Sequence, residues 1–312
     1  MPDPSERCAT HRGVVFTIYS VPKPFRGHIG VIQENAIRSW TLLGGDHEII
    51  LMGAEKGTAE VADRLGVRHE PKIRRSKYGT PLMSSVFERA QLVATHDWLC
   101  YVNSDIILMG DLARAMRRIT KLRRSVLVSG RRWRIEVDGA LDFEPGWEAR
   151  WRRHVRANGA RDSLQCMDYF VFPRGLVRKF PKFALGRGRW DSYLPYRARA
   201  SGALFVDATD SIMAVHQNHD YALPQGKVGN RSKAGMKVSP EGIWNRYLVP
   251  GEEKCTLGDA DRKLTRWRLK RAIDHHRVRY WLWMNRHRPV VGFPVRKMCE
   301  RHKVRVKALL VR

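Results

Sequence analysis

The chain has 312 residues, of which 43% are hydrophobic and 29% are charged, a composition that can bury a full-sized core and argues against a largely disordered protein. Lysine and arginine number 58 against 31 aspartates and glutamates, so the formal net charge is +27 and attraction to nucleic acid, anionic lipid or nucleotide phosphates is expected. Residues 261–312 carry 17 of these cations and only three acids, so about half of the excess lies near the C-terminus.

The five cysteines are scattered and form no Cys-x-x-Cys pair, which argues against a disulfide framework or a zinc ribbon. The N-terminus lacks the apolar core of a signal peptide, and no apolar stretch is long enough for a membrane span. We therefore expect a cytoplasmic protein, either soluble or peripheral on the inner face of a membrane.

Apolar runs of strand length alternate with helical periodicities through the N-terminal third of the chain. The pattern predicts, in order, a strand over 14–20, a helix over 29–43, a strand over 48–53, a short helix over 59–65, a brief strand near Val67, a helix capped by Thr80 that runs to about Ala94, and a strand over 98–102. Such an order predicts a mostly parallel sheet with ligands at the carboxyl ends of its strands.

Further along the chain, strands are expected over 125–129 and 167–172, and an Arg-rich amphipathic helix from Asp261 onward. The domain organisation that we expect has three parts, which are a disordered N-terminus over 1–12, a catalytic domain over 13–250, and a basic, partly helical extension over 251–312.

The junction after the strand over 98–102 carries the strongest chemical signal. Asn103, Ser104 and Asp105 follow this buried strand directly. Carboxylate and amide oxygens at a strand end can share Mg²⁺ or Mn²⁺ with the phosphates of a substrate. The same residues also suit an ordinary turn in which Asp105 is a local cap.

A second group of polar side chains lies in the run His216-Gln-Asn-His219, which follows an apolar segment. His216 is a candidate ligand for the same metal as Asp105, because a neutral imidazole binds divalent metals. The alternative is a structural histidine, since a His-x-x-His spacing does not by itself define a zinc site.

Asp191 and Trp190 follow the glycine-rich loop that begins at Gly186. In one interpretation Trp190 stacks on a sugar ring and Asp191 is the general base that deprotonates a hydroxyl. In the other, Asp191 caps a helix and Trp190 belongs to the core. Asp168 has the same ambiguity, between acceptor binding and structure, and Arg132 is a candidate for neutralising a diphosphate.

Set side by side, these residues resemble the pattern of GT-A fold glycosyltransferases, in particular glycosyltransferase family 2 and other nucleotide-diphospho-sugar transferases. The resemblance spans about residues 14–221 and rests on Asn103-Ser104-Asp105, which matches the DxD motif at the end of the fourth strand of that fold, and on Asp191 and His216. It implies a mixed, mostly parallel α/β sheet flanked by helices, followed here by a basic helical extension. Asn103 replaces the first acid of the motif, so weaker metal use or a catalytically silent relative stays open.

The resemblance implies an enzyme that moves a sugar from a nucleotide-diphosphate sugar to a hydroxyl of a glycan, a polysaccharide or a lipid-linked saccharide, with Mn²⁺ or Mg²⁺. Its metal ligands would be Asn103, Asp105 and His216, and Asp191 would be the base of an inverting reaction. The expected nucleotide contacts are Tyr19, Ser20, Gly79, Thr80, Pro81 and Ser104, and the expected substrate contacts are Arg132, Asp168 and Trp190. The donor sugar, the base of the nucleotide and the stereochemical outcome stay open.

Two other classes compete with this interpretation. A basic nucleic-acid-binding protein would use the C-terminal cations on phosphates and Trp267, Trp281 and Trp283 on bases, although no known nucleic-acid-binding module is visible. A nucleotidyltransferase would need a glycine-rich loop after the first strand, where Val21-Pro-Lys-Pro24 stands instead. The Arg-rich segment over 261–312 equally suits an anionic membrane surface, which is the partner that we favour for it.

Overall fold

A computed structural model describes residues 15–122, 124–219, 239–249 and 253–272. The chain divides into two compact units, Met1–Ala272 and Ile273–Arg312, and the second lies outside the described residues, as does the expected disordered N-terminus over 1–12. Within the described residues, no helix is both long enough and apolar enough to cross a bilayer.

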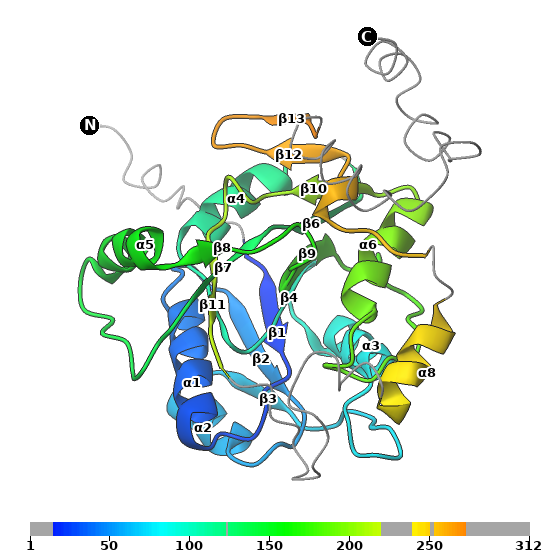
Figure 1. Cartoon of the computed structure of the whole chain (residues 1–312), viewed down its shortest axis with the longest axis horizontal. Helices are drawn as coiled ribbons and strands as arrows, with labels where there is room; N and C mark the ends of the chain where they lie inside the picture. Colours follow the sequence, from blue (N-terminus) through cyan, green and yellow to red (C-terminus); the bar gives the residue numbers. More distant parts are fainter. Residues whose placement is uncertain (1–14, 123, 220–238, 250–252, 273–312) are drawn as a thin grey trace, which may run out of the picture. The chain divides into compact units, whose positions relative to one another are not determined.

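The first half of the described chain alternates strands with helices, as the sequence predicts (Figure 1). Its elements are β1 (Thr17–Ser20), α1 (Gly27–Thr41), β2 (Glu48–Met52), α2 (Thr58–Arg64), β3 (Arg68–Glu70), α3 (Met83–Val93), β4 (Trp98–Val102), β5 (Ile106–Ile107) and α4 (Asp111–Ile119). The second half contains β6 (Val126–Ser129), β7 (Arg132–Ile135), α5 (Trp147–Asn158), β8 (Ala160–Arg161), β9 (Tyr169–Pro173), α6 (Trp190–Ala200), β10 (Leu204–Asp207), β11 (Ala214–Gln217), α8 (Pro240–Leu248), β12 (Arg262–Leu264) and β13 (Leu269–Arg271).

The main sheet has nine strands in the order β13-β12-β10-β6-β9-β4-β1-β2-β3. All of them run parallel except β9, which lies antiparallel between β4 and β6, and the edge strand β13. This mixed, mostly parallel sheet flanked by helices is the predicted fold class. A second sheet, β5-β11-β7-β8, brings β11 beside the segment that follows β4.

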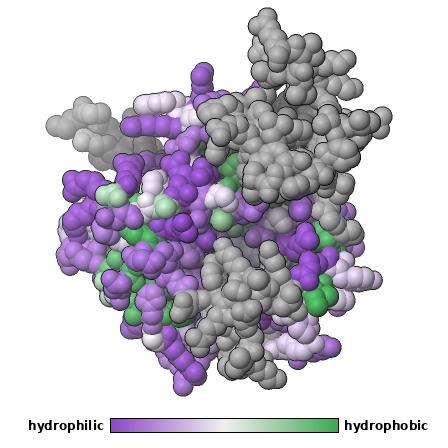
Figure 2. Space-filling view, in the orientation of Figure 1, coloured by the Kyte–Doolittle hydropathy of each residue, from purple (hydrophilic) through white to green (hydrophobic). Residues whose placement is uncertain are grey.

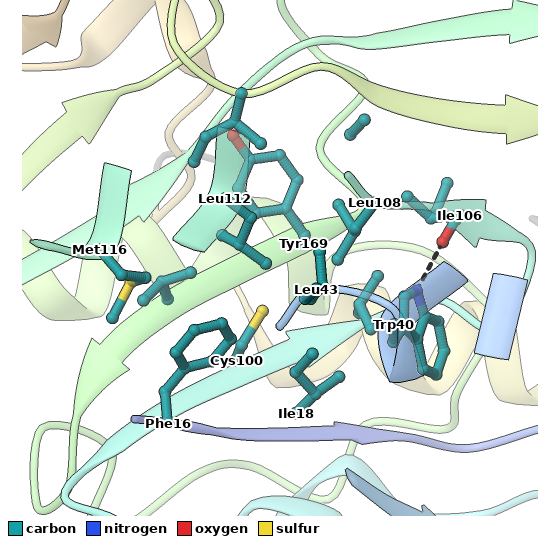
Figure 3. Packing of buried hydrophobic residues seen from close by; sticks show 14 of the residues in the cluster. Phe16, Ile18, Trp40, Leu43, Cys100, Ile106, Leu108, Leu112, Met116 and Tyr169 are labelled. Atoms are coloured by element: carbon teal, nitrogen blue, oxygen red, sulfur yellow. Dashed lines mark hydrogen bonds between the residues drawn. The ribbon is translucent and has the colours of Figure 1, made fainter. Parts of the chain in front are cut away.

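A hydrophobic core fixes α1 and α4 on the sheet (Figure 3). Phe16, Ile18 and Cys100 from the sheet and Trp40 from α1 are at most 1% exposed. The indole N–H of Trp40 donates to the carbonyl oxygen of Ile106 at 2.9 Å, so even the polar atom of this large side chain is satisfied. Because Ile106 lies next to Asp105, this core contact also fixes the segment after β4.

Residues 253–272 differ from the prediction. The sequence predicts an Arg-rich helix from Asp261, but the structure has the antiparallel hairpin β12–β13, joined to the main sheet through β10. Leu264 is buried and Leu269 packs on the core, while Arg266 and Arg268 in the turn between them are exposed. The boundary expected after residue 250 therefore falls within the first compact unit.

Candidate active site

Two buried hydroxyls join the carboxyl ends of β1 and β4. Ser20 Oγ donates to the carbonyl oxygen of Val102 at 2.6 Å, and the hydroxyl of Ser104 lies 2.8 Å from that of Ser20. Ser20 is 0% exposed and Ser104 is 7% exposed. Both are predicted to contact a nucleotide, and in the structure their hydroxyls join the ends of the two strands.

Asp105, His216 and His219 form a group whose ligand atoms all lie within 4.8 Å of one another. Asp105 Oδ2 is 2.9 Å from His219 Nε2 and 3.6 Å from His216 Nε2. The register of the second sheet explains the meeting, because His216 on β11 pairs with Ile106 on β5, the residue next to Asp105. The predicted pairing of Asp105 with His216 is thus present as a contact, and His219 joins it.

The backbone of Asp105 is held by a buried amide. Gln217, which is 0% exposed, donates from Nε2 to the carbonyl oxygens of Ile32 and Asp105, at 2.7 and 3.2 Å. Its carboxamide oxygen accepts from Asn35 on α1 at 3.0 Å. The acid is therefore supported by both β11 and α1, which is the kind of preorganisation that a ligand site needs.

The charges in this group favour an ionised acid beside a neutral imidazole. Burial by itself would raise the pKa of Asp105, but His216, His219 and Lys23 outweigh it and hold that pKa well below its ordinary value. Burial lowers the pKa of His216, so its ring is neutral at pH 7. A carboxylate and neutral imidazoles are the protonation states that bind a divalent metal.

Two buried atoms of the group have no hydrogen-bond partner among the described residues, namely Asp105 Oδ1 and His216 Nδ1. Unsatisfied buried acceptors are costly, and a cation would satisfy Asp105 Oδ1. One carboxylate with two imidazoles is a donor set that suits Mn²⁺ better than Mg²⁺, which prefers oxygen ligands. The residues present therefore fit the predicted divalent metal.

Asn103 belongs to a different network from the one predicted. Its carboxamide oxygen accepts from the Tyr101 hydroxyl at 3.0 Å, and its Nδ2 donates to Asp168 Oδ1 at 2.9 Å. The other carboxylate oxygen of Asp168 accepts from Arg132 Nη1 at 2.5 Å, and Arg132 Nε donates to Asp162 at 2.7 Å. Arg132 and Asp168 are only 9% and 8% exposed, so this is a buried ion-pair network beside the metal group.

Asp191 lies in the first turn of α6 and is half-buried. Burial raises its pKa to about 6, although the backbone N–H of Ser192 donates to Oδ1 at 2.9 Å and opposes this, and nearby Asp168 raises the pKa further. A carboxylate with a pKa close to neutral is suited to general base catalysis.

Trp190 has the core position that was the alternative in the sequence. It is 5% exposed, and its ring centroid is 4.9 Å from that of Tyr101 and 5.6 Å from that of Phe170. Its indole face is thus covered by aromatic side chains instead of being available to a sugar. Its packing fixes the start of α6, and with it Asp191.

The remaining nucleotide candidates fall into two groups. Tyr19 is 0% exposed, packs edge-on against Phe87 and Tyr101, and does not reach the surface. In the loop over 79–81, Gly79 is exposed, Thr80 is half-buried and Pro81 is buried. Helix α3 begins at Met83 with Leu82 as its N-cap, so Thr80 does not cap it. Thr80 Oγ1 instead donates to Glu241 at 2.8 Å.

Three functional candidates were not selected from the sequence. His219 was signalled by its place in the run with His216. Lys23 follows β1 and contributes to the low pKa of Asp105, and its position directly after a strand end was the available signal. Glu241, on α8, accepts hydrogen bonds from Ser76, Thr80 and Arg187 and is 6% exposed, and no sequence signal indicated it.

No protein-family model matches the sequence, and a search of curated proteins found no match. Among solved structures, the chain is similar to TarS residues 1–349 of S. aureus in complex with UDP-GlcNAc, at 9% identity and a TM-score of 0.47, over 76% of this chain and 73% of that one. It is also similar to the mannosyltransferase PcManGT of Pyrobaculum calidifontis in complex with GDP-Man and Mn²⁺, at 16% identity and a TM-score of 0.42, over 66% of this chain and 57% of that one.

A further similar structure is the glucosyl-3-phosphoglycerate synthase of M. tuberculosis, at 14% identity and a TM-score of 0.44, over 77% of this chain and 83% of that one. These neighbours are of the GT-A type, which is the type that the sequence pattern resembles.

Proposed function

We propose that this protein is a glycosyltransferase that moves a sugar from a nucleotide-diphosphate sugar to a hydroxyl acceptor with the help of a divalent metal. The observation that carries the proposal is the group of Asp105, His216 and His219 at the carboxyl edge of a parallel sheet. Ligands of open α/β sheets bind at that edge, where a metal held by this group would meet a diphosphate.

In addition to the proposed metal ligands, the donor site contains one basic side chain, that of Lys23. A divalent cation bound by Asp105, His216 and His219 would supply positive charge against the diphosphate that leaves. Lys23, in the loop after β1, contributes positive charge in the same region, since it lowers the pKa of Asp105. We assign it to the phosphates of the donor.

Asp191 is assigned the general base of an inverting transfer. With a pKa near 6 its carboxylate is ionised at pH 7.5 and accepts the proton of the acceptor hydroxyl. The acceptor oxygen then forms a bond to the anomeric carbon while the bond from that carbon to the phosphate oxygen breaks, and the electron pair leaves with the nucleoside diphosphate. Asp168, held by Asn103 and Arg132, keeps a second negative charge near the base and sustains its raised pKa.

The acceptor that we propose is a polysaccharide or a lipid-linked saccharide, reached at the cytoplasmic face of a membrane. What supports this is the net charge of +27, which favours a chain that works next to an anionic surface. The part of the C-terminal segment over 273–312 lies outside the described residues.

The test is calorimetric binding of a panel of nucleoside diphosphates and nucleotide sugars, with and without Mn²⁺, to the wild type, Asp105→Asn and Asp142→Asn. Asp142 is an exposed acid whose side chain is 64% accessible, so its variant is a matched loss of one negative charge. We expect one nucleotide to bind only with Mn²⁺, and to lose this binding in Asp105→Asn alone. Absence of nucleotide binding together with salt-sensitive binding of nucleic acid would overturn the proposal in favour of a basic nucleic-acid-binding protein.

A further inference from the structure

The hairpin β12–β13 presents an exposed tryptophan among arginines. Its turn, Thr265–Arg268, is closed by Thr265 N donating to the carbonyl oxygen of Arg268 at 3.0 Å. Trp267, within this turn, is 81% exposed, and the guanidinium of Arg266 lies 4.9 Å from its ring centroid. Trp267 is thus presented to solvent at the tip of the hairpin, beside a cation.

The hairpin is a rigid part of the fold. Asp261, which precedes β12, is 4% exposed, accepts from Phe205 N at 2.9 Å, and forms an ion pair with Arg199 at 3.0 Å. Leu264 and Leu269 pack on the hydrophobic core. The tip therefore has a defined position on the first compact unit.

Helix α4 extends the cationic surface of the hairpin. Arg118 Nη1 donates to the carbonyl oxygens of Thr265 and Arg266, at 2.5 and 2.9 Å, which fixes the turn beside the helix. Figure 1 shows the hairpin in orange next to α4, and the part of this region that is visible in Figure 2 is largely hydrophilic. We define the basic face as seven exposed cations of α4, of the segment that follows α4 and of the hairpin, namely Arg117, Lys121, Arg124, Arg266, Arg268, Lys270 and Arg271.

The charges of the basic face are not neutralised by neighbours. None of its seven cations forms an ion pair with another described residue, and the nearby acids are engaged elsewhere. Asp261 pairs with Arg199 and Asp210 pairs with Lys263. Such an uncompensated field selects a polyanionic partner.

We propose that the basic face and Trp267 dock the protein on an anionic lipid bilayer. The cations would lie against the headgroups, and the indole of Trp267 would enter the interface between water and hydrocarbon, which tryptophan prefers. Single-stranded nucleic acid is the less suitable partner, because its binding sites use several aromatic side chains for successive bases and this face presents one. The docking surface stands on its own geometry, and only its purpose, to reach a lipid-linked acceptor, rests on the proposed function.

The experiment is co-sedimentation of the full chain with vesicles of phosphatidylcholine, alone and mixed with phosphatidylglycerol. Each cation near an anionic surface is worth about fivefold in binding, so the double variant Arg266→Gln, Arg268→Gln is expected to lose about 25-fold on the mixed vesicles. The control, Arg153→Gln with Arg156→Gln, removes the same charge from exposed positions of α5 and should bind like the wild type. A blue shift of tryptophan fluorescence on the mixed vesicles should disappear in Trp267→Phe.

Equal binding by the two double variants would overturn the inference, as would equal binding to neutral and anionic vesicles. A larger loss of binding to a single-stranded oligonucleotide than to the vesicles would assign the face to nucleic acid instead. Mn²⁺-dependent nucleotide binding, measured on the same variants, should not change. A failure of membrane docking is thereby separated from a failure of the proposed transferase.

Discussion

Asn103 Nδ2 donates to Asp168 Oδ1 across 2.9 Å, so the residue that replaces the first acid of a DxD motif holds another carboxylate in place. An aspartate at this position would bring two carboxylates into contact inside a buried network. The asparagine is therefore consistent with the buried network, and in the proposed metal site two histidines would compensate for the missing acid.

Asn103→Asp is the direct test of this relationship. Two adjacent carboxylates cannot both be ionised without cost, and the donor to Asp168 is lost, so we expect a loss of about 1 to 3 kcal/mol in the free energy of unfolding at pH 7.5. The loss should be smaller at pH 5. Repulsion between the two adjacent carboxylates raises the pKa of one of them, so that this acid is protonated at pH 5 and can donate a hydrogen bond to the other. Urea unfolding at both pH values measures this. Tighter Mn²⁺ binding by an equally stable variant would instead make position 103 a metal ligand.

The two histidines should contribute separately to metal affinity. His216→Ala and His219→Ala each remove one imidazole from Asp105, and each is expected to weaken Mn²⁺ binding by about 10 to 100-fold. Mn²⁺ titration with an excess of the nucleoside diphosphate in solution measures this, with His154→Ala on the exposed side of α5 as the control. Wild-type affinity in His219→Ala would remove His219 from the site and leave Asp105 and His216 as its ligands.

The pH dependence of the reaction should report Asp191. Its pKa is raised to about 6, so kcat/KM should rise as the pH increases through 6 and the base ionises. Asp191→Asn should lower kcat by about 10² to 10⁴-fold while leaving nucleotide binding intact. If the residual activity of Asp191→Asn still showed the same rise of kcat/KM through pH 6, the titrating group would be a different residue.

The raised pKa of Asp191 also predicts how the stability of the folded protein depends on pH. A carboxyl whose pKa is higher in the folded than in the unfolded protein favours folding at low pH and opposes it once the pH rises through the folded value. Asp191→Asn should therefore stabilise the protein at pH 7.5, by on the order of 2 kcal/mol, and bring no gain at pH 4. Thermal unfolding at the two pH values measures the difference. A variant less stable than the wild type at pH 7.5 would contradict the burial of this charge.

The variant Trp190→Ala distinguishes between a core role and a sugar-stacking role of this tryptophan. Trp190→Ala should cost about 3 to 5 kcal/mol in the free energy of unfolding, because it removes a side chain packed between Tyr101 and Phe170. Trp267→Ala, at an 81% exposed position, is the control and should stay within about 0.5 kcal/mol of the wild type. A stable Trp190→Ala variant with a raised KM for the acceptor would restore the stacking interpretation.

Local patterns predicted most of the sheet, because strand and helix periods are properties of short segments. β4 was predicted at its observed bounds, and β1, β2, β6 and β9 were predicted within a few residues. The hairpin β12–β13 was missed because each of its strands has three residues, too few to reveal alternation among so many arginines. Strands of that length are fixed by the edge they pair with, which in this protein is β10.

The site was predictable where chemistry follows a strand end directly, as for Asp105, and where a histidine run follows an apolar segment. The side chains of Tyr19, Ser20, Asn103 and Ser104 were assigned to ligands because they share that edge. Which of two neighbouring side chains faces the core depends on pairing between β1 and β4, whose partners are some 80 residues apart in the chain. Glu241 had no local signal, since its partners lie 161 and 54 residues away.

The separation between Asp105 and His219, 114 residues, has a consequence for biosynthesis. At typical elongation rates the ribosome needs about 6 to 23 seconds to add that much chain, so the acid is made long before its ligand partners. Two further strands of the main sheet also come late in the sequence. They are β9, which lies between β4 and β6, and β10, which pairs with β6. A nascent chain that ends before β11 thus lacks both histidines of this group, and the proposed metal site would be completed only when the fold is nearly complete.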